Sequence, residues 1–368
     1  SCIALRVVQE NREIKVHNCS FSKCSQSSNS EQTWENCLSL NKFNKVEISE
    51  CRFSECGSSG GGNVIVIQSG VGECTISGCR IEFSNPSSSG SGISTYTDNI
   101  LIENNEFIKC NENTIRVECK TEGSNEFRLI NNLFTGSEEG AALQIAGNRL
   151  TEIPTIKDNR FENIKVLQDL EQMIIIDISK TINNIEIVNN TFNQIQTQIE
   201  NFGININREK DETNENQEIL QIKYIECNFT NNKQIKRQES KHENTKITYD
   251  RCLFESNEGD GYGGSLYIKN YQTVTIETYE FNSNFVTEIV VGTGNKLPGQ
   301  GGSIFIESGR VIISRSKFNN NYGGYGQAIY LLNNDCQLKI DSNSEFNNNI
   351  NLKNMIDKQY AIHSKSEH

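Results

Sequence analysis

The chain has 368 residues, with 35 Lys and Arg against 47 Asp and Glu, and a formal net charge of −12. This acidic balance argues against nucleic acid or an anionic membrane surface as the main partner. No apolar run approaches the ~18 residues that cross a membrane, so no membrane insertion is predicted.

A short phrase recurs along the chain: alternating apolar residues lead to a corner and then to a phenylalanine. The first copies are IKVHNCSF, ending at Phe21, and VEISECRF, ending at Phe53, and a degenerate copy has Ile81 at this position. A second phrase, a small residue followed by two alternating apolar residues, precedes the copies, as in CLSL at 37–40. The later anchors are Phe107, Phe134, Phe161, Phe192, Phe229, Phe254, Phe281, Phe318 and Phe346.

The apolar residues alternate with period 2, and no window keeps the 3.6-residue period of a helix. Repeats of ~25–30 residues, each with three short strands, are typical of a stacked solenoid. We therefore predict an all-β fold: a single right-handed parallel β-helix of about 12 coils, three short strands per coil, spanning residues 1–368. A propeller or a helical solenoid fits the pattern less well.

The position two residues before each phenylalanine forms a column of Cys and Asn. An Asn at such a corner can satisfy turn backbone groups and bond to the Asn of the next coil. We predict a corner ladder that includes Asn105, Asn132, Asn159 and Asn190.

Residues 258–349 carry a second signature. GGSLYI at 263–268 precedes Phe281-x-x-Asn284, and GGSIFI at 301–306 precedes Phe318-x-x-Asn321. These resemble the GG-[A/L/V/I] and F-x-x-N repeats of the polymorphic outer membrane protein family, within the pectin-lyase-like β-helix superfamily. The match is degenerate over 1–257, where the coils of 1–119 are rich in Cys. The resemblance implies a secreted or surface rod with adhesive or structural roles and supplies no catalytic residues.

Enzymes of that superfamily need clustered carboxylates or a base beside calcium. The sequence has no Asp-Asp pair, and its four His have no partner at metal or triad spacing, so we predict no catalytic residue, resident metal or cofactor. Glu258 and Asp260 lie in a glycine-rich turn where calcium could bind, although a solvated turn is favoured.

Three aromatic residues occupy the same outward position of successive first strands: Tyr267, Phe305 and Tyr330. Stacked at ~4.8 Å, they predict an exposed platform that could bind sugar rings or a partner. The alternative is a surface ladder that only stabilises its own coils.

Three sequons, at Asn18, Asn189 and Asn228, fall on outward corner positions and predict N-linked glycans in a secreted protein. Stacked coils also place cysteines in pairs, and we predict at least one disulfide near the N-terminus. The pairs are Cys2 with Cys37, Cys19 with Cys51, and Cys24 with Cys56. Cys74 and Cys336 are expected to be buried free thiols.

Together these features predict a non-enzymatic extracellular or cell-surface module with a structural or adhesive role. The alternatives are a carbohydrate-active enzyme and a glycan-binding module. Because neither end shows a capping pattern, we expect further coils of the same chain or a neighbouring copy, stacked end to end into a fibre, to cover the ends.

Overall fold

The structure is a computed structural model of the chain. It describes residues 5–8, 12–22, 37–56, 64–83, 92–109, 114–119, 126–136, 142–166, 173–179, 181–197, 204–208, 219–234, 244–269, 271–277, 279–291, 295–332, 336–351 and 362–364. Within these ranges the only regular elements are β-strands. The same ranges therefore hold no helix long and apolar enough to cross a membrane. The chain divides into two compact units: unit 1 comprises residues 1–182 and 203–215, and unit 2 comprises 183–202 and 216–368.

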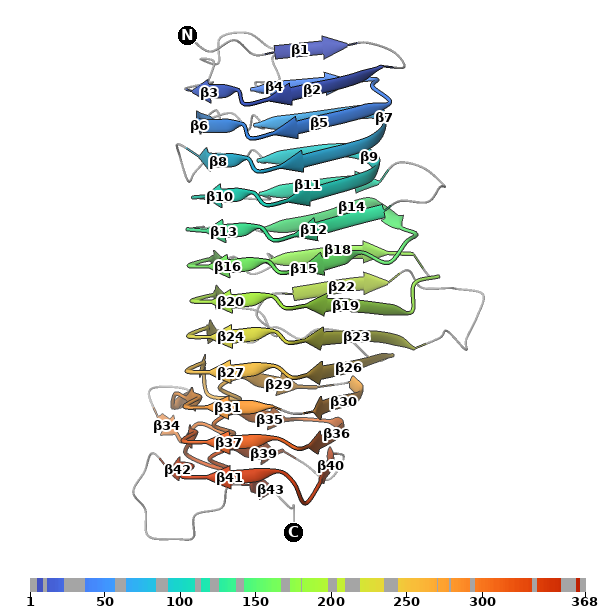
Figure 1. The fold of residues 1–368 in the computed structure, drawn as a ribbon. Helices are drawn as coiled ribbons and strands as arrows, with labels where there is room; N and C mark the ends of the chain where they lie inside the picture. Colours follow the sequence, from blue (N-terminus) through green and yellow to red (C-terminus); the bar gives the residue numbers. More distant parts are fainter. Residues whose placement is uncertain are drawn as a thin grey trace. The chain divides into compact units, whose positions relative to one another are not determined.

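Unit 1 is a parallel β-solenoid whose successive coils stack strand on strand (Figure 1). Its first strands are β1 (Leu5–Val8), β4 (Leu38–Asn41), β11 (Ile115–Cys119), β14 (Leu143–Leu150), β18 (Ile174–Ile178) and β22 (Ile204–Arg208). Its second strands are β2 (Glu13–His17), β5 (Lys45–Ser49), β12 (Glu126–Ile130) and β15 (Thr155–Lys157), while β7 (Ile65–Ser77) and β9 (Ile93–Glu103) each serve as first and second strand together. Its third strands are β3 (Ser20–Ser22), β6 (Arg52–Cys56), β8 (Arg80–Phe83), β10 (Glu106–Ile108), β13 (Leu133–Thr135) and β16 (Arg160–Glu162), and β17 (Lys165–Val166) follows β16.

Unit 2 is also a parallel β-solenoid, with an added two-residue fourth strand in each coil. Its second strands are β19 (Asn184–Val188), β23 (Leu220–Ile225), β26 (Thr245–Asp250), β30 (Tyr271–Glu277), β36 (Gly309–Ser314) and β40 (Cys336–Ile340). Its third strands are β20 (Thr191–Asn193), β24 (Asn228–Thr230), β27 (Leu253–Glu255), β31 (Glu280–Asn282), β37 (Lys317–Asn319) and β41 (Glu345–Asn347). Its fourth strands are β21 (Gln196–Thr197), β25 (Lys233–Gln234), β28 (Glu258–Gly259), β32 (Phe285–Val286), β38 (Tyr322–Gly323) and β42 (Ile350–Asn351).

The first strands of unit 2 differ from those of unit 1. They are only three residues long and form a separate four-stranded sheet. They are β29 (Leu266–Ile268), β35 (Ile304–Ile306), β39 (Ile329–Leu331) and β43 (Ile362–Ser364). An antiparallel hairpin, β33 (Ile289–Val291) and β34 (Asn295–Leu297), is inserted between the coils of β29 and β35.

The predicted fold class, a parallel β-helix with three short strands per coil, is confirmed, but the predicted count of about 12 coils does not hold for the first strands. First strands of the predicted kind stack through eight coils of unit 1, from β1 to β22. In unit 2 the glycine-rich turns shorten this strand and separate its sheet from that of the second strands.

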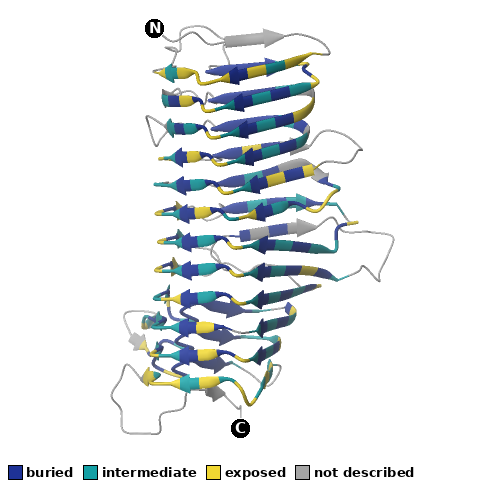
Figure 2. Ribbon diagram, in the orientation of Figure 1, coloured by how far each residue is buried: buried dark blue, intermediate teal, exposed yellow. Residues whose placement is uncertain are grey.

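The core follows from the period-2 alternation of apolar residues. Strand β18 alternates buried and half-buried residues, and its inward Ile174, Ile176 and Ile178 have no exposed surface (Figure 2). Parallel pairing in register stacks each anchor on the next, so the ring centroids of Phe107 and Phe134 lie 4.8 Å apart. Such a stacked pair contributes about 0.5–1.5 kcal/mol beyond its buried area.

Each coil turns at single residues with positive φ. In unit 1 the corner before the third strand has Asn104 at φ 57 and Asn131 at φ 53, and the corner after it has Asn163 at φ 55. Asn enters this left-handed region more readily than other residues with a Cβ, because its short amide can bond locally. The abundance of Asn at the corners therefore has a backbone cause.

The column before the third strand is a hydrogen-bonded ladder in unit 1. The Nδ2 of Asn132 donates to the carbonyl oxygens of Ile102 and Ile130, at 2.9 and 3.0 Å. It also donates to Oδ1 of Asn159 at 3.0 Å, while its own Oδ1 accepts from the backbone N–H of Asn105. One carboxamide thus closes the corner of its own coil and joins two neighbours.

In unit 2 the corresponding ladder runs at the other corner, three residues after the phenylalanine. The Nδ2 of Asn257 donates to the carbonyl of Phe229 at 2.9 Å and to Oδ1 of Asn284 at 3.0 Å. Its Oδ1 accepts from the backbone N–H of Asn232. The ladder consists of Asn232, Asn257, Asn284, Asn321 and Asn349. Asn190, the fourth residue of the predicted ladder, is buried in unit 2 and donates to the carbonyl of Val188.

Candidate binding surface on the glycine-rich coils

Glycine-rich turns lead into the first strands of unit 2. Gly301 and Gly326 have φ values of 72 and 57, a region that favours glycine. A Cβ on Gly302 would lie 1.9 Å from the carbonyl oxygen of Gln327 in the next coil. The turns can therefore lie against their neighbours only because they carry no side chain.

The aromatic stripe predicted on these first strands is stacked but not exposed. Ring centroids of Tyr267 and Phe305 lie 5.3 Å apart, and those of Phe305 and Tyr330 lie 5.5 Å apart. Their exposed fractions are only 2%, 0% and 3% in chain order, so the prediction of a solvent-facing platform is wrong. The glycine-rich turn folds Tyr262 back over the strand, where its ring meets Phe305 edge-on at 4.8 Å.

A small polar network borders this aromatic stack. The hydroxyl of Tyr267 donates to Glu307, and the other carboxylate oxygen of Glu307 lies 2.8 Å from Nζ of Lys269. The two charged side chains are 18% and 22% exposed, so this ion pair is shielded from solvent more than the surface pairs of the other coils. Burial, with smaller effects of Tyr325 and Tyr262, raises the pKa of Tyr330.

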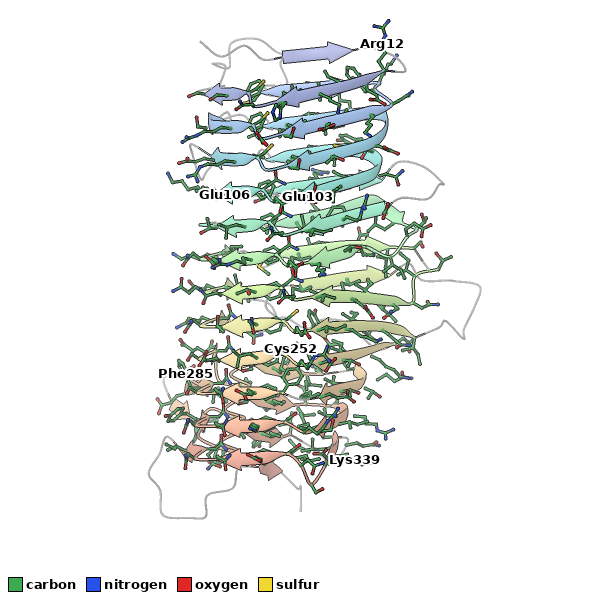
Figure 3. All side chains as sticks on the ribbon, viewed as in Figure 1. Arg12, Glu103, Glu106, Cys252, Phe285 and Lys339 are labelled. Carbon is green, nitrogen blue, oxygen red and sulfur yellow. The ribbon has the colours of Figure 1, made fainter. Side chains whose placement is uncertain are left out.

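Two outward rows of uncharged side chains lie on the last three coils of unit 2. The apolar row consists of Phe285, Tyr322 and Ile350, paired in register on the fourth strands. Phe285 and Tyr322 are partly exposed and Ile350 is 43% exposed; Figure 3 labels Phe285 at the margin of its coil. This row was missed by the sequence analysis, although its signal is simple: each member follows an anchoring phenylalanine by four residues.

The amide row consists of Asn282, Asn319 and Asn347, which end the third strands of the same coils. Nδ2 of Asn319 donates to Oδ1 of Asn282 at 3.0 Å, and Nδ2 of Asn347 donates to Oδ1 of Asn319 at 3.2 Å. Each amide row residue stands three positions before an apolar row residue in its coil. The two rows therefore follow neighbouring sides of the same corner.

The two carboxylates considered for calcium have separate partners. Glu258 pairs with Nζ of Lys233 at 2.6 Å in the coil before. Oδ1 of Asp260 accepts from the hydroxyl of Thr287 at 3.3 Å. Among the residues that the structure describes, no group of three or more His, Cys, Asp or Glu is arranged to hold a metal ion.

The three sequon asparagines occupy different backbone positions. Asn18 and Asn189 are exposed corner residues with φ values of 50 and 51. Asn228 is half-buried on β24, where it pairs with Thr191 and Leu253 of the adjacent coils.

The predicted pair Cys19 and Cys51 forms no disulfide, and Cys37 is not in a disulfide either. Sγ of Cys51 donates to the carbonyls of Val16 and Ser49, at 3.5 and 3.2 Å, and Sγ of Cys19 donates to the carbonyl of His17. In-register stacking gives these cysteines equivalent carbonyl partners, so both thiols donate to the backbone of the corner. Cys2 and Cys24 lie outside the described residues, and only the backbone of Cys56 is described.

The other two thiols that were predicted to be buried differ from each other. Cys74 is free and 2% exposed, and burial raises its pKa. Cys336 forms no disulfide and is only half-buried, in the last described second strand, where Sγ donates to the carbonyl of Ile306 at 3.3 Å.

A model of the family described as "right handed beta helix region" matches residues 36–219, which is half of the chain. The chain belongs to this family. The family match and the parallel solenoid support the pectin-lyase-like β-helix superfamily. The resemblance of residues 258–349 to polymorphic outer membrane protein repeats stays a prediction. No curated protein and no solved structure matches this β-helix.

Proposed function

We propose that this β-helix is a non-enzymatic structural or adhesive module of an extracellular or cell-surface protein. The observation that carries the proposal is the Asn ladder of unit 2, in which buried carboxamides join successive coils. The Nδ2 of Asn321, for example, donates to the carbonyl of Phe281 and to Oδ1 of Asn349. Hydrogen bonds between successive coils make the β-helix rigid, and a rigid module suits a structural or adhesive role.

The repeats of residues 258–349 support the same assignment. Their resemblance to polymorphic outer membrane protein repeats favours a secreted or surface-exposed role. The exposed Asn18 and Asn189 suit glycan attachment in such a setting.

The location is tested on intact cells of the source. An antibody against the chain should label cells without permeabilisation, and brief external protease treatment should remove the signal. Peptide mass spectrometry after enzymatic deglycosylation in heavy-oxygen water should mark Asn18, Asn189 or Asn228. Signal only after permeabilisation, with all three sites unmodified, would refute the extracellular proposal.

The competing function is a carbohydrate-active enzyme of the pectin-lyase-like type. Incubation with polygalacturonate and neutral polysaccharides should release neither reducing ends nor unsaturated products that absorb in the ultraviolet. Release of either product above a heat-treated sample would replace the structural proposal with the enzymatic one.

End-to-end contact, or further coils of the same chain, is the partner that we propose for the last described coil. Phe346 and Leu338 are partly exposed, whereas Phe318 and Val311, their partners one coil earlier, have no exposed surface. Sedimentation velocity should show concentration-dependent association that Leu338→Glu weakens. Lys339→Glu, an outward neighbour on the same strand, is the control. A strictly monomeric protein would count against the fibre.

A further inference from the structure

The apolar row has a composition that packing in the coil does not require. The same outward column has Gln196, Lys233 and Glu258 in the three coils that precede Phe285. Those polar residues show that the position tolerates solvent-exposed, hydrophilic side chains. The change to Phe285 and Tyr322 therefore calls for a cause outside the coil, and exposed apolar groups in register are typical of a contact surface.

The amide row beside it supplies hydrogen bonds without charge. Each carboxamide has two N–H donors and an oxygen with two lone pairs. Within the amide row, one N–H of Asn319 donates to Asn282, and one lone pair of its oxygen accepts from Asn347. Nδ2 of Asn282 also donates to Glu280 and Nδ2 of Asn347 to Glu345, at 3.2 and 3.5 Å, so oxygen lone pairs are the capacity that repeats at the spacing of the coils, ~4.8 Å.

An apolar face combined with a row of amides matches the chemistry of a sugar chain. The C–H faces of sugar rings pack on aromatic rings, and their hydroxyls exchange hydrogen bonds with carboxamides. The six side chains of the two rows carry no charge, although Glu280, Lys317 and Glu345 flank the amide row on the same strands, and the chain as a whole has a net charge of −12. This charge balance disfavours an acidic polysaccharide and fits a neutral one.

We propose that the apolar and amide rows form a binding site for a neutral polysaccharide that runs along the coils. Phe285 and Tyr322 pack against its rings, and Asn282 and Asn319 bind its hydroxyls. The site rests on the proposed adhesive function and gives it a ligand class. It replaces the stripe Tyr267, Phe305 and Tyr330, which the glycine-rich turns cover.

The test is affinity electrophoresis of the full chain in native gels that contain hydroxyethyl cellulose, galactomannan or polygalacturonate. At least one neutral polymer should retard the protein, and polygalacturonate should not. The double variant Phe285→Ala/Tyr322→Ala should weaken retardation by about tenfold in apparent affinity. Tyr322→Phe keeps the ring and should retain most of the binding that Tyr322→Ala loses.

Glu258→Ala is the matched control, because Glu258 occupies the same column one coil before Phe285 and should leave retardation unchanged. Circular dichroism and thermal melting establish that every variant is folded. Absence of retardation by both neutral polymers would overturn the proposal, as would equal loss in Glu258→Ala. Sedimentation showing a dimer that Tyr322→Ala dissociates would assign the surface to a second copy instead. Cell labelling is independent of this assay, so failure of the binding site and failure of the surface location are distinguishable.

Discussion

Units 1 and 2 both use Asn side chains to bond the backbone groups at a corner of each coil, but at different corners. Unit 1 puts its Asn ladder before the third strand, as at Asn132, and unit 2 puts its ladder after that strand, as at Asn257. In both, a buried amide donates to backbone carbonyls and accepts a backbone N–H. The requirement is therefore for a group with both functions at one corner of each coil, and either corner can supply it.

Cysteine replaces Asn at several corners of unit 1 and makes the same contacts to backbone carbonyls. Sγ of Cys79 donates to the carbonyls of Ile48 and Ser77, at 3.7 and 3.4 Å, which correspond by position to the carbonyls bound by Asn132. A thiol is a weak donor and a poor acceptor. The columns with Cys thus keep the contacts to carbonyls, while a weakly accepting sulfur stands in place of the amide oxygen that binds the next coil.

The glycines of the two units give the largest expected contrast. Gly302→Ala in unit 2 should cost about 4 kcal/mol or unfold the glycine-rich coils, because its Cβ would lie 1.9 Å from a backbone oxygen. Gly78→Ala in unit 1 should cost only about 1 kcal/mol, since its φ is 61 but the nearest atom to a Cβ is 3.7 Å away. Urea unfolding followed by circular dichroism measures both. Similar costs would show that steric contact does not distinguish the units.

The ladders allow a sharper test of donor against acceptor. Asn257→Ala should destabilise by about 3 kcal/mol, because a buried N–H of Asn232 and the carbonyl of Phe229 lose their partner. Asn257→Cys should cost about 1 kcal/mol less, since a thiol retains a donor. The same pair of substitutions at Asn132 should behave alike if the ladders are equivalent. Equal losses for Ala and Cys would mean that the thiol contacts contribute nothing.

The sequence was sufficient for the periodic part of this structure. Phe134 and Phe161 could be placed in one column because parallel coils in register repeat the same inward position. It could also place Tyr267 and Phe305 on the side facing away from the main core. It could not show that Tyr262 folds over them, because that depends on the path of a glycine-rich turn, which has no periodicity.

The apolar row was not predicted from the sequence for a related reason. Phe285 and Tyr322 lie on two-residue strands, which are too short to give an alternation pattern. Only their constant offset from the anchors reveals the column. The disulfide prediction was limited by what spacing alone can show: stacked Cys19 and Cys51 are close enough for a bridge, but both stay thiols that donate to backbone carbonyls.

Alkaline pH should lower the stability of the two units by smaller amounts and from different pH values. Burial raises the pKa of Cys74 in unit 1 above its ordinary 9.0, and burial raises that of Tyr249 in unit 2 above 10.0. For an acid whose folded pKa is raised, the stability is fully present below the unfolded pKa and is lost as pH rises toward the folded one. Each group should therefore cost about 1.4 kcal/mol per pH unit, from pH 9 for Cys74 and from pH 10 for Tyr249. Urea unfolding of Cys74→Ala and Tyr249→Phe should show slopes reduced from those points, and unchanged slopes would contradict the assignment.

The smallest expected effect lies at the corner after the third strand, where Ser256 in unit 2 and Asn163 in unit 1 have φ values of 54 and 55. The backbone demand is the same, but Asn enters the left-handed region more readily than Ser. Ser256→Asn should stabilise the protein by about 0.5 kcal/mol, and Asn163→Ser should destabilise it by a similar amount. Both are measured as shifts of the urea midpoint at constant slope. Opposite and nearly equal shifts would establish that the left-handed corner is an intrinsic backbone cost shared by the units, whereas shifts of the same sign would mean that neighbouring contacts of each coil decide the preference.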